Sequence, residues 1–388
     1  MTQDELNKAL KTIQTRFDAV NTLFIKKIAA QIARIGEFNQ SSINMLLVMA
    51  EVTSDVEEIT RELQTAANLT KPEVIQLYNR AMNDTFTDPR FKKAFQAGLS
   101  VPPEQRQRLV TYTRGVALQT LQTLDNLSNT TAISQPYKAA VDTAVLAVSS
   151  GLTSYSAAMR DTIRQLGYNG MQVYYASGYH RRLDTAVRQN ILDGTRQISM
   201  HCADEVGNAL GYDAVELSAH MHSAPDHEPV QGRVFLRDEY DKMQSGMSFT
   251  DIDGQSYSGF ERPIGEWNCM HFPAPFSTKY SKRLYSNEQL KDWAQKNNDG
   301  CEINGKHKTT YEAQQMMRKV ETEVRRWKDT AVAAQIAGDD SLRRQCQSHI
   351  NDLVTKYDQI AAASGLTAHR DRMTVEGFKP VKLAGKTA

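Results

Sequence analysis

The first thirty residues carry an apolar stripe that strongly limits what this chain can fold into. Apolar side chains recur at steps of three and four residues, which places them on one face of a helix, close to a coiled-coil seam. They are Leu6, Leu10, Ile13, Phe17, Val20, Phe24 and Ile28. Such a face must be buried against another element, so we expect a long helix inside a helical assembly. Gly36 and the polar residues 39–41 are expected to end it.

Two capping signatures follow in the next part of the chain. Ser54 precedes Glu57 by three residues, and Thr70 precedes Glu73 by three. In this spacing a hydroxyl accepts a hydrogen bond from a free N–H group while the glutamate reaches back, so we expect helices to begin there. Pro72 would then lie in the first turn of its helix, where a missing donor costs little.

Helix is also predicted over most of the following stretch. Pro102-Pro103 indicates a helix start, and further helices are expected over residues 137–149 and 153–166. From 166 to 212 the pattern predicts a long central helix, with a break near Gly178 or Gly194.

The composition changes between residues 213 and 305. This segment is rich in glycine, proline, serine, aspartate and aromatic residues. Short strands are expected at 214–218, 233–236 and 255–257, and a helix capped by Asn287 at 287–296. We therefore predict a compact α+β module.

The C-terminal part returns to a helical pattern. Thr309 and Glu312 form a third capping box, opening a helix that is expected to run to about Ile336. Gly338 should end it, and Asp339 should cap a second helix, which makes an antiparallel hairpin. The last residues, 366–388, are basic and lack periodicity, so we expect a flexible or draped tail.

The predicted fold class is therefore mainly α with a small α+β module. Net charge is +1, so no bulk attraction to nucleic acid or to an anionic membrane is expected. No apolar run approaches the roughly 18 residues of a membrane span, and the N-terminus lacks a signal-peptide layout. The expected organisation is an N-terminal helical region (1–165), a central helix (166–212), a His/Cys-rich α+β module (213–305), a C-terminal helical hairpin (306–365) and a basic tail (366–388).

Histidine and cysteine gather in two short loops of the module, SAHMHSAPDHEPVQGRVF and GEWNCMHFPAPF. The other three cysteines are scattered and form no CxxC, which is typical of reduced thiols in a cytoplasm. Imidazole and thiolate are preferred ligands of Zn²⁺, and a loop-rich module gains folding energy from such a site. The candidate ligands are His220, His227, Cys269 and His271.

Two other interpretations of these loops stay open. The imidazoles, including His222, can simply hydrogen-bond backbone groups, with Cys269 as a small buried apolar side chain. Alternatively, Cys269 with His220 or His227 can form a nucleophile–base pair, or Asp226 can assist a histidine in acid–base chemistry. Walker, GxSxG, HExxH and strand–helix GxGxxG signatures are absent, so common nucleotide-binding and hydrolase classes are not indicated.

Basic residues on the predicted helices are candidate contacts for phosphates or for an acidic partner. Acidic residues are interleaved with them, which favours an ordinary solvated face. The candidate contact residues are Arg181, Arg182 and Arg188 on the central helix, and Arg325 and Arg326 on the hairpin.

The two loops and their surroundings resemble the phage minor capsid protein 2 family. The resemblance rests on ELSAH, the His–Pro–His loop ending in QGR, and the N-C-x-H-x-x-x-P-F segment. TYEAQQMMRKVETEVRRWK, GLTAHRDR and VRQNILDGTRQISMHCADEVGNALGYDAVELSAH are also similar, so that residues 160 to 378 are covered. The motif positions are His220, Pro225, His227, Gln231, Gly232, Asn268, Cys269 and His271.

The resemblance implies a structural component of a tailed-phage or prophage virion, assembled in the cytoplasm of a Gram-positive host. Its implied partners are the portal protein, other capsid proteins and phage DNA, with a role in packaging or ejection and no membrane contact. We therefore expect a structural protein and not a metabolic enzyme. The alternative is a metal-dependent or Cys–His hydrolase carried in the virion.

Overall fold

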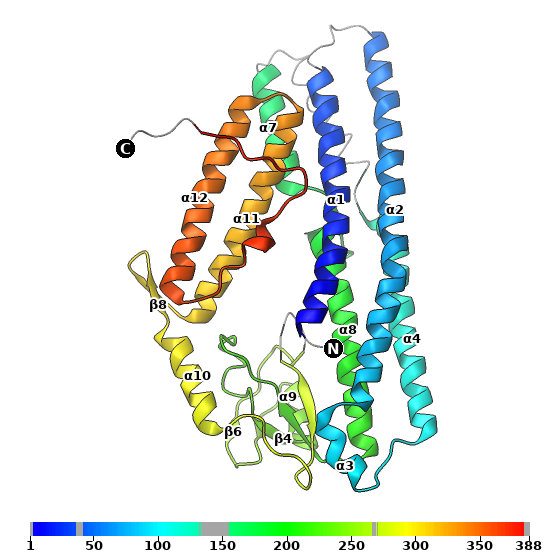
Figure 1. Ribbon diagram of the computed structural model, residues 1–388, viewed down its shortest axis with the longest axis vertical. Coiled ribbons are helices and arrows are strands. Elements are labelled where there is room, and N and C mark those ends of the chain that lie inside the picture. Colours follow the sequence, from blue (N-terminus) through cyan, green and yellow to red (C-terminus); the bar gives the residue numbers. More distant parts are fainter. Residues whose placement is uncertain are drawn as a thin grey trace. The chain divides into compact units, whose positions relative to one another are not determined.

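The computed structural model describes residues 3–35, 42–131, 133, 155–265, 269 and 271–383. It confirms a mainly helical fold with a few short strands (Figure 1). The chain divides into two compact units, and the division falls within the helices α2 (Ser42–Phe86), α4 (Pro103–Asp125), α8 (Leu183–Ala209) and α11 (Thr310–Ile336). The loop-rich unit comprises residues 73–120 and 192–315, and the helical unit comprises 2–72, 121–191 and 316–388.

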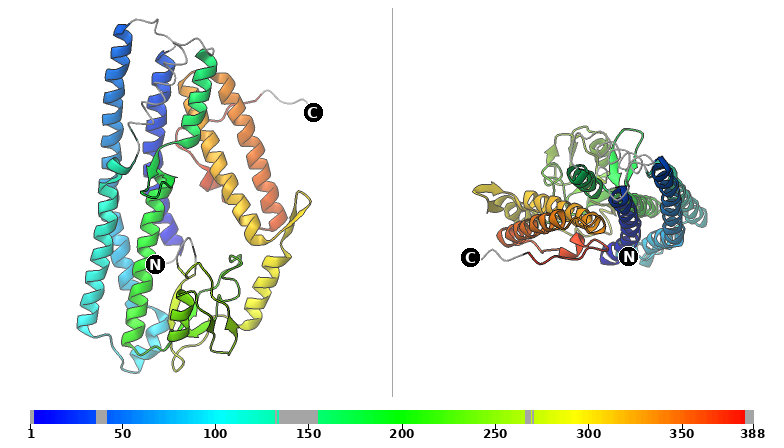
Figure 2. Two further views of the ribbon diagram at one scale, coloured as in Figure 1. Left: turned by 180° about the vertical axis from the view of Figure 1, so that it is seen from behind. Right: turned by 90° about the horizontal axis from the view of Figure 1, so that it is seen from above.

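The helical unit is built around α1 (Gln3–Ile35). All seven residues of the apolar stripe are buried, as predicted. Within this unit α1 lies between the first half of α2 and α7 (Tyr155–Asn169) (Figure 2). α7 approaches α11 very closely, because a Cβ on Gly167 would lie 2.3 Å from the Cα of Thr330. Only glycine permits this helix contact.

The two predicted helix starts at Ser54 and Thr70 are wrong, because α2 runs without interruption through both and contains Pro72. The Thr70 hydroxyl bonds to the carbonyl of Ala66 at 2.8 Å instead of capping a helix. An internal proline costs about 3 kcal/mol. The fully buried Leu63, Val74 and Tyr78 on either side show that tertiary packing offsets this cost.

The central helix is shorter than predicted. An antiparallel hairpin of β1 (Gln172–Tyr174) and β2 (His180–Arg182) precedes α8, and Gly178, at φ 82°, lies in its turn. Helix is therefore wrong for His180, Arg181 and Arg182, although the break near Gly178 is confirmed. Gly194 does not break α8; a Cβ there would lie 2.0 Å from the hydroxyl of Tyr78.

The C-terminal hairpin is confirmed. Thr309 and Glu312 exchange both capping hydrogen bonds, at 3.0 and 3.1 Å. Asp339 caps α12 (Asp340–Ser364) through the N–H of Leu342. The tail, with the 3₁₀ turn η2 (Arg370–Met373), crosses the hairpin (Figure 1), and Lys328 donates to the carbonyl of Met373.

The loop-rich unit contains a three-stranded antiparallel sheet in the order β4-β3-β7. Its strands are β3 (Ala214–Leu217), β4 (Val234–Leu236) and β7 (Pro273–Phe276). A core cluster lies against this sheet: Val215, Leu217, Val230, Phe235, Met243, Phe249 and Ile264. The strands predicted at 214–218, 233–236 and 255–257 are confirmed within one residue at each end, whereas β7 was not predicted.

Shorter elements complete the two units. Ser286 rather than Asn287 caps α10, since its hydroxyl accepts from the N–H of Gln289. The remaining elements are η1 (Pro89–Phe91), α3 (Lys92–Gln96), α4 (Pro103–Asp125), α5 (Leu127–Thr130), α9 (Arg237–Gln244), β5 (Phe249–Thr250), β6 (Ser256–Tyr257), α10 (Asn287–Asp299), β8 (Cys301–Ile303) and β9 (Lys306–Lys308).

Three sequence predictions lie outside the described residues, namely the helix end at Gly36 and residues 39–41, the helix at 137–149 and the position of Asn268. Helix at 153–166 is confirmed from residue 155 by α7. Among the described helices, none combines the length and apolar character needed to cross a bilayer.

Candidate functional site

Strand pairing brings the two histidine-containing loops of the loop-rich unit together. β3 and β7 are antiparallel, and Leu217 pairs with Pro273 at the end of the ladder. Ser218 extends this pairing, since its N–H donates to the carbonyl of Phe272 and its hydroxyl accepts from the N–H of Phe272. The chain that leaves β3 therefore lies beside the chain that enters β7. His220 and His271 belong to these two segments, and their rings stack with centroids 4.6 Å apart.

Three side chains converge at the centre of this site. The Sγ atom of Cys269 lies 3.2 Å from Nδ1 of His227 and 3.3 Å from Nδ1 of His271. One ligand atom from each residue lies within 4.8 Å of the others, and all three residues are buried. This cluster, His227, Cys269 and His271, is named the Cys–His cluster below. Such a set of nitrogen and sulfur atoms has the composition of a zinc site.

The far side of each ring is held by an oxygen atom. Nε2 of His227 lies 2.8 Å from the backbone carbonyl of Arg262. Nε2 of His271 lies 3.3 Å from Oε1 of Gln231, which also accepts from the N–H of His220 at 3.0 Å. Because the oxygens of Arg262 and Gln231 only accept, each ring in its neutral form carries its proton on Nε2 and faces Cys269 with an unprotonated Nδ1. The hydroxyl of Ser223 lies 3.3 Å from Nε2 of His271 and donates to the carbonyl of Ala224, so it too can accept from this ring.

The electrostatics of the cluster favour ionisation of its sulfur. Burial by itself raises the pKa of the Cys269 thiol, but hydrogen bonds from protonated imidazoles of His227 and His271 and from the backbone of Gly265 outweigh it and bring this pKa to about 5. Burial acts to lower the pKa of His227, and its hydrogen bonds with Cys269 and Arg262 reverse this into a net rise. A thiolate is both a nucleophile and a metal ligand, so the lowered pKa suits either chemistry.

The other predicted site residues lie around the cluster. Asp226 forms a two-bond ion pair with Arg262, at 2.7 and 2.9 Å, and its contact with His227 is longer, at 3.7 Å. Nε2 of His220 and Nδ1 of His222 are buried without a hydrogen-bond partner. His220 was predicted with the three residues of the Cys–His cluster as a metal ligand, and its ring stacks on His271 beside that cluster. Arg262 and Gln231 were not predicted to position the rings, and only their contacts reveal that role.

Gly232 is required by the backbone of the first loop. It has φ 69°, and a Cβ there would lie 2.6 Å from Cδ2 of Leu290. Its N–H returns to the carbonyl of Leu217, closing the loop between β3 and β4. The motif QGR therefore contributes one positioning side chain, Gln231, and one obligatory glycine.

The arginines proposed as partner contacts occupy different environments. Arg182 is buried, and Arg325 donates to the buried Asp184 at 2.9 Å. Arg326 pairs with Glu323 and stacks on Tyr168. Arg188 is half-buried on α8. Arg181 lies on the β1–β2 hairpin, where its guanidinium covers the ring of Tyr179.

A buried ion network in the helical unit was missed by sequence reasoning. Arg182 bonds to Asp329 at 2.7 Å and lies 3.5 Å from Asp184 and 3.7 Å from Asp18. Two guanidiniums, those of Arg182 and Arg325, thus face three carboxyl groups. The five residues come from three segments that are far apart in the sequence, namely α1, the β2–α8 junction and α11, and no local spacing links these segments.

The carboxyl groups of this network differ in their pKa. Burial together with Asp184 and Asp329 raises the pKa of Asp18 to about 7. Burial opposes ionisation of Asp184, but Arg182 and Arg325 outweigh it and lower its pKa to about 2. Burial also raises the pKa of Asp329, but Asp329 accepts the short hydrogen bond from Arg182. Because the network has one carboxyl group more than it has guanidiniums, one carboxyl group is expected to be protonated, and we assign this proton to Asp18.

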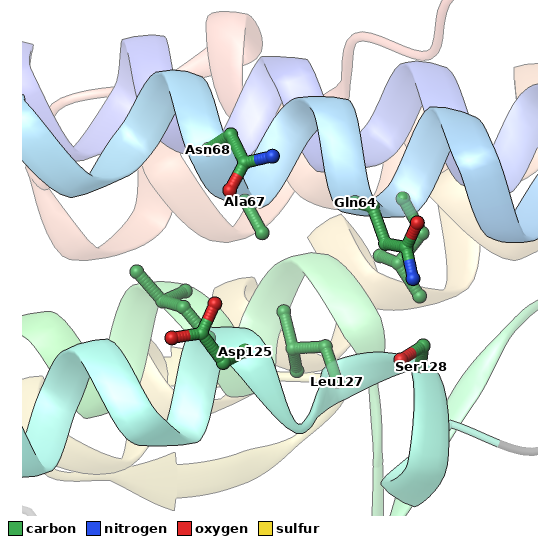
Figure 3. Close-up of a pocket in the computed structure, with 8 residues that line it drawn as sticks. Gln64, Ala67, Asn68, Asp125, Leu127 and Ser128 are labelled. Atoms are coloured by element: carbon green, nitrogen blue, oxygen red, sulfur yellow. The ribbon is translucent and has the colours of Figure 1, made fainter.

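A small hollow lies between α2 and the α4–α5 segment of the helical unit (Figure 3). Its volume is about 170 Å³, and polar atoms of Gln64, Asn68, Asp125 and Ser128 line it. It contains none of the histidines or cysteines, so it is unconnected with the Cys–His cluster.

Comparisons of the sequence with known proteins identify a phage protein family. A scan against protein families matches the family described as phage minor capsid protein 2 over residues 1–360. A curated protein named "Structural protein", from Lactococcus phage LL-H, is 23% identical over 348 residues, which cover 84% of this chain and 86% of that protein. No solved structure matches the chain significantly.

Proposed function

The chain belongs to the phage minor capsid protein 2 family, and from this premise we propose that it is a structural component of a tailed-phage head, associated with the portal and the head interior. The supporting relative is itself a phage structural protein of similar length. The same proposal implies contact with other capsid proteins. It also implies that the protein is present in the mature virion, whether the virion comes from a phage or from a prophage.

Burial of the Cys–His cluster is the observation that favours a structural role over a hydrolytic one. Cys269 is only 2% exposed, and His227 is fully buried. A nucleophile has to meet the substrate atom that it attacks, at a distance of about 3 to 3.5 Å. A buried sulfur between two imidazoles is better suited to hold two loops together than to react with a substrate.

The β1–β2 hairpin is our candidate for the partner-binding element. Tyr174, Tyr175 and Tyr179 are exposed aromatic residues, at 48, 41 and 56%. The rings of Tyr175 and Tyr179 stack on each other, and Tyr174 stacks on His180. Exposed tyrosines beside an arginine are typical of protein interfaces.

We assign this contact to a capsid or portal protein rather than to DNA. Arg182 and Arg325, two of the predicted phosphate contacts, are already paired with buried carboxylates. Arg181 alone contributes little to a salt-dependent phosphate contact, because such affinity grows with the number of phosphates neutralised. A role of this protein in DNA packaging or ejection would therefore be exerted through its contact with a capsid or portal protein and not through binding of DNA.

Localisation in purified virions tests the proposal. Mass spectrometry of gradient-purified particles should detect the protein, and affinity capture from lysates should recover it with the portal protein. The double variant Tyr175→Ala/Tyr179→Ala should lose portal capture, whereas Leu118→Ala, which removes a 61% exposed side chain on α4, should retain it. Absence of the protein from mature particles would refute the assignment, and portal capture unaffected by the tyrosine changes would exclude the hairpin.

A further inference from the structure

We propose that His227, Cys269 and His271 bind a zinc ion through Nδ1, Sγ and Nδ1. The inference is independent of how the protein is placed in the virion. It rests on the tautomers of two buried rings and on the atom between them.

The hydrogen bonds on the far side of each ring fix which nitrogen is free to bind a metal. A carbonyl oxygen cannot donate, so the proton of His227 lies on Nε2, which faces the carbonyl of Arg262. The orientation of the Gln231 amide is set by the N–H of His220, and its oxygen then accepts from Nε2 of His271. The hydroxyl of Ser223, also 3.3 Å from this Nε2, donates to the carbonyl of Ala224 and so can accept the same proton. Metal-binding histidines are held in this way by a carbonyl or carboxylate acceptor on the other nitrogen.

The guanidinium of Arg262 gives a second indication for the His227 tautomer. Its NH2 group lies 3.4 Å from Nδ1 of His227 and can only donate. A proton on Nδ1 would point toward this donor. The positive charge of Arg262 is offset by its two-bond pair with Asp226, so it does not exclude a cation from the cluster.

A metal ion accepts electron pairs from all three atoms at once. A thiol has one hydrogen, so without a metal Cys269 can donate to one Nδ1 only. The donor that then remains for Nδ1 of His227 is the guanidinium of Arg262, at the longer distance of 3.4 Å.

The two sulfur–nitrogen separations are close to those of tetrahedral zinc. Zn–S and Zn–N bonds of about 2.3 and 2.0–2.1 Å place sulfur and nitrogen about 3.6 Å apart. The two S···N distances here are 3.2 and 3.3 Å, so a shift of a few tenths of an ångström suffices. Thiolate and imidazole together favour Zn²⁺ over Mg²⁺ or Ca²⁺, which prefer oxygen ligands.

The full-length protein, purified without chelator, should contain one zinc per chain by inductively coupled plasma mass spectrometry. Replacing zinc by Co²⁺ should give a thiolate-to-cobalt charge-transfer band and the intense visible bands of a tetrahedral site. The variants Cys269→Ser and His271→Gln should lower zinc affinity at least tenfold. The matched controls are Cys301→Ser, on β8 outside the cluster, and His222→Asn, which keeps a residue that tolerates φ 63°.

If a cluster variant fails to fold, the cobalt spectrum of the unmutated protein still tests the proposal, because it reports whether a thiolate binds the metal. Folded protein, checked by circular dichroism, that takes up neither zinc nor cobalt overturns the proposal. Cobalt uptake without the thiolate band also overturns it, because the metal would then be bound elsewhere. Equal zinc affinity in the cluster variants and the controls has the same consequence.

Discussion

Nδ1 of His227 lies 3.2 Å from Sγ of Cys269, although 42 positions of the chain separate the two residues. The contact depends on the pairing of β3 with β7 and on the return of the first loop to β4. It makes the two motif loops one structural module, whatever ion or partner the module binds. The following predictions test this module and the helical unit separately.

Gln231→Ala should destabilise the loop-rich unit by about 1 to 3 kcal/mol, because the N–H of His220 and Nε2–H of His271 lose their shared acceptor. Chemical denaturation monitored by circular dichroism measures this. Gln255→Ala, at an exposed position of the same unit, should change the free energy of unfolding by less than about 0.5 kcal/mol. Equal effects of the two changes would contradict the positioning role of Gln231.

Asp18→Asn should reveal the pH dependence of the ion network. The pKa of Asp18 is raised to about 7, so its stabilising contribution is complete below about pH 4 and is lost as the pH rises through 7. The groups facing it are Arg182, Asp184, Asp329 and Arg325. The variant mimics the protonated form, so its stability relative to the unmutated protein should increase by about 2 to 3 kcal/mol from pH 5 to pH 8.

Urea unfolding at several pH values gives the comparison for Asp18. Asp184 should behave in the opposite sense, since its pKa is lowered to about 2 and its contribution is lost only as the pH falls below about 4. A pH-independent difference between Asp18→Asn and the unmutated protein would show that Asp18 is ionised throughout.

Arg182→Met should destabilise the helical unit by about 3 to 5 kcal/mol, because three buried carboxyl groups lose their shared cation. Arg181→Met is the matched control, since the neighbouring side chain covers Tyr179 at the hairpin surface. Its effect should stay below about 1 kcal/mol. Thermal unfolding distinguishes the two variants. An Arg182→Met variant as stable as the unmutated protein would show that the positive charge of Arg182 does not stabilise the network.

Gly167→Ala and Gly115→Ala should have opposite effects on the stability of the protein. A Cβ at Gly167 would meet the backbone of Thr330, so α7 and α11 must separate and the melting temperature should fall. Nothing lies within 4 Å of a Cβ at Gly115, inside α4, so alanine there should stabilise the protein by about 0.5 to 1 kcal/mol. A destabilising Gly115→Ala would show that α4 is not an ordinary helix at that point.

Local patterns predicted a large part of the fold. The burial of Leu10, Phe17 and Ile28 follows from their spacing, and the caps at Thr309 and Asp339 follow from neighbours three residues away. The same type of local pattern failed at Thr70, because S/T-x-x-E also occurs inside a helix that packing holds together. Helix was also wrong for Arg182, whose place in β2 and the ion network depends on distant carboxylates.

The candidate site, like the fold, was predicted from the sequence only in part. The sequence by itself determined that histidine and cysteine gather in two proline-rich loops, and it determined the family, since both depend on residue identity and order along the chain. Only the tertiary structure decided that His227 and His271 face Cys269, that Gln231 and Arg262 hold their rings, and that His220 stacks on the ring of His271. The physical reason is that ring orientation is set by hydrogen bonds between segments about forty residues apart, and strand pairing alone brings these segments within reach.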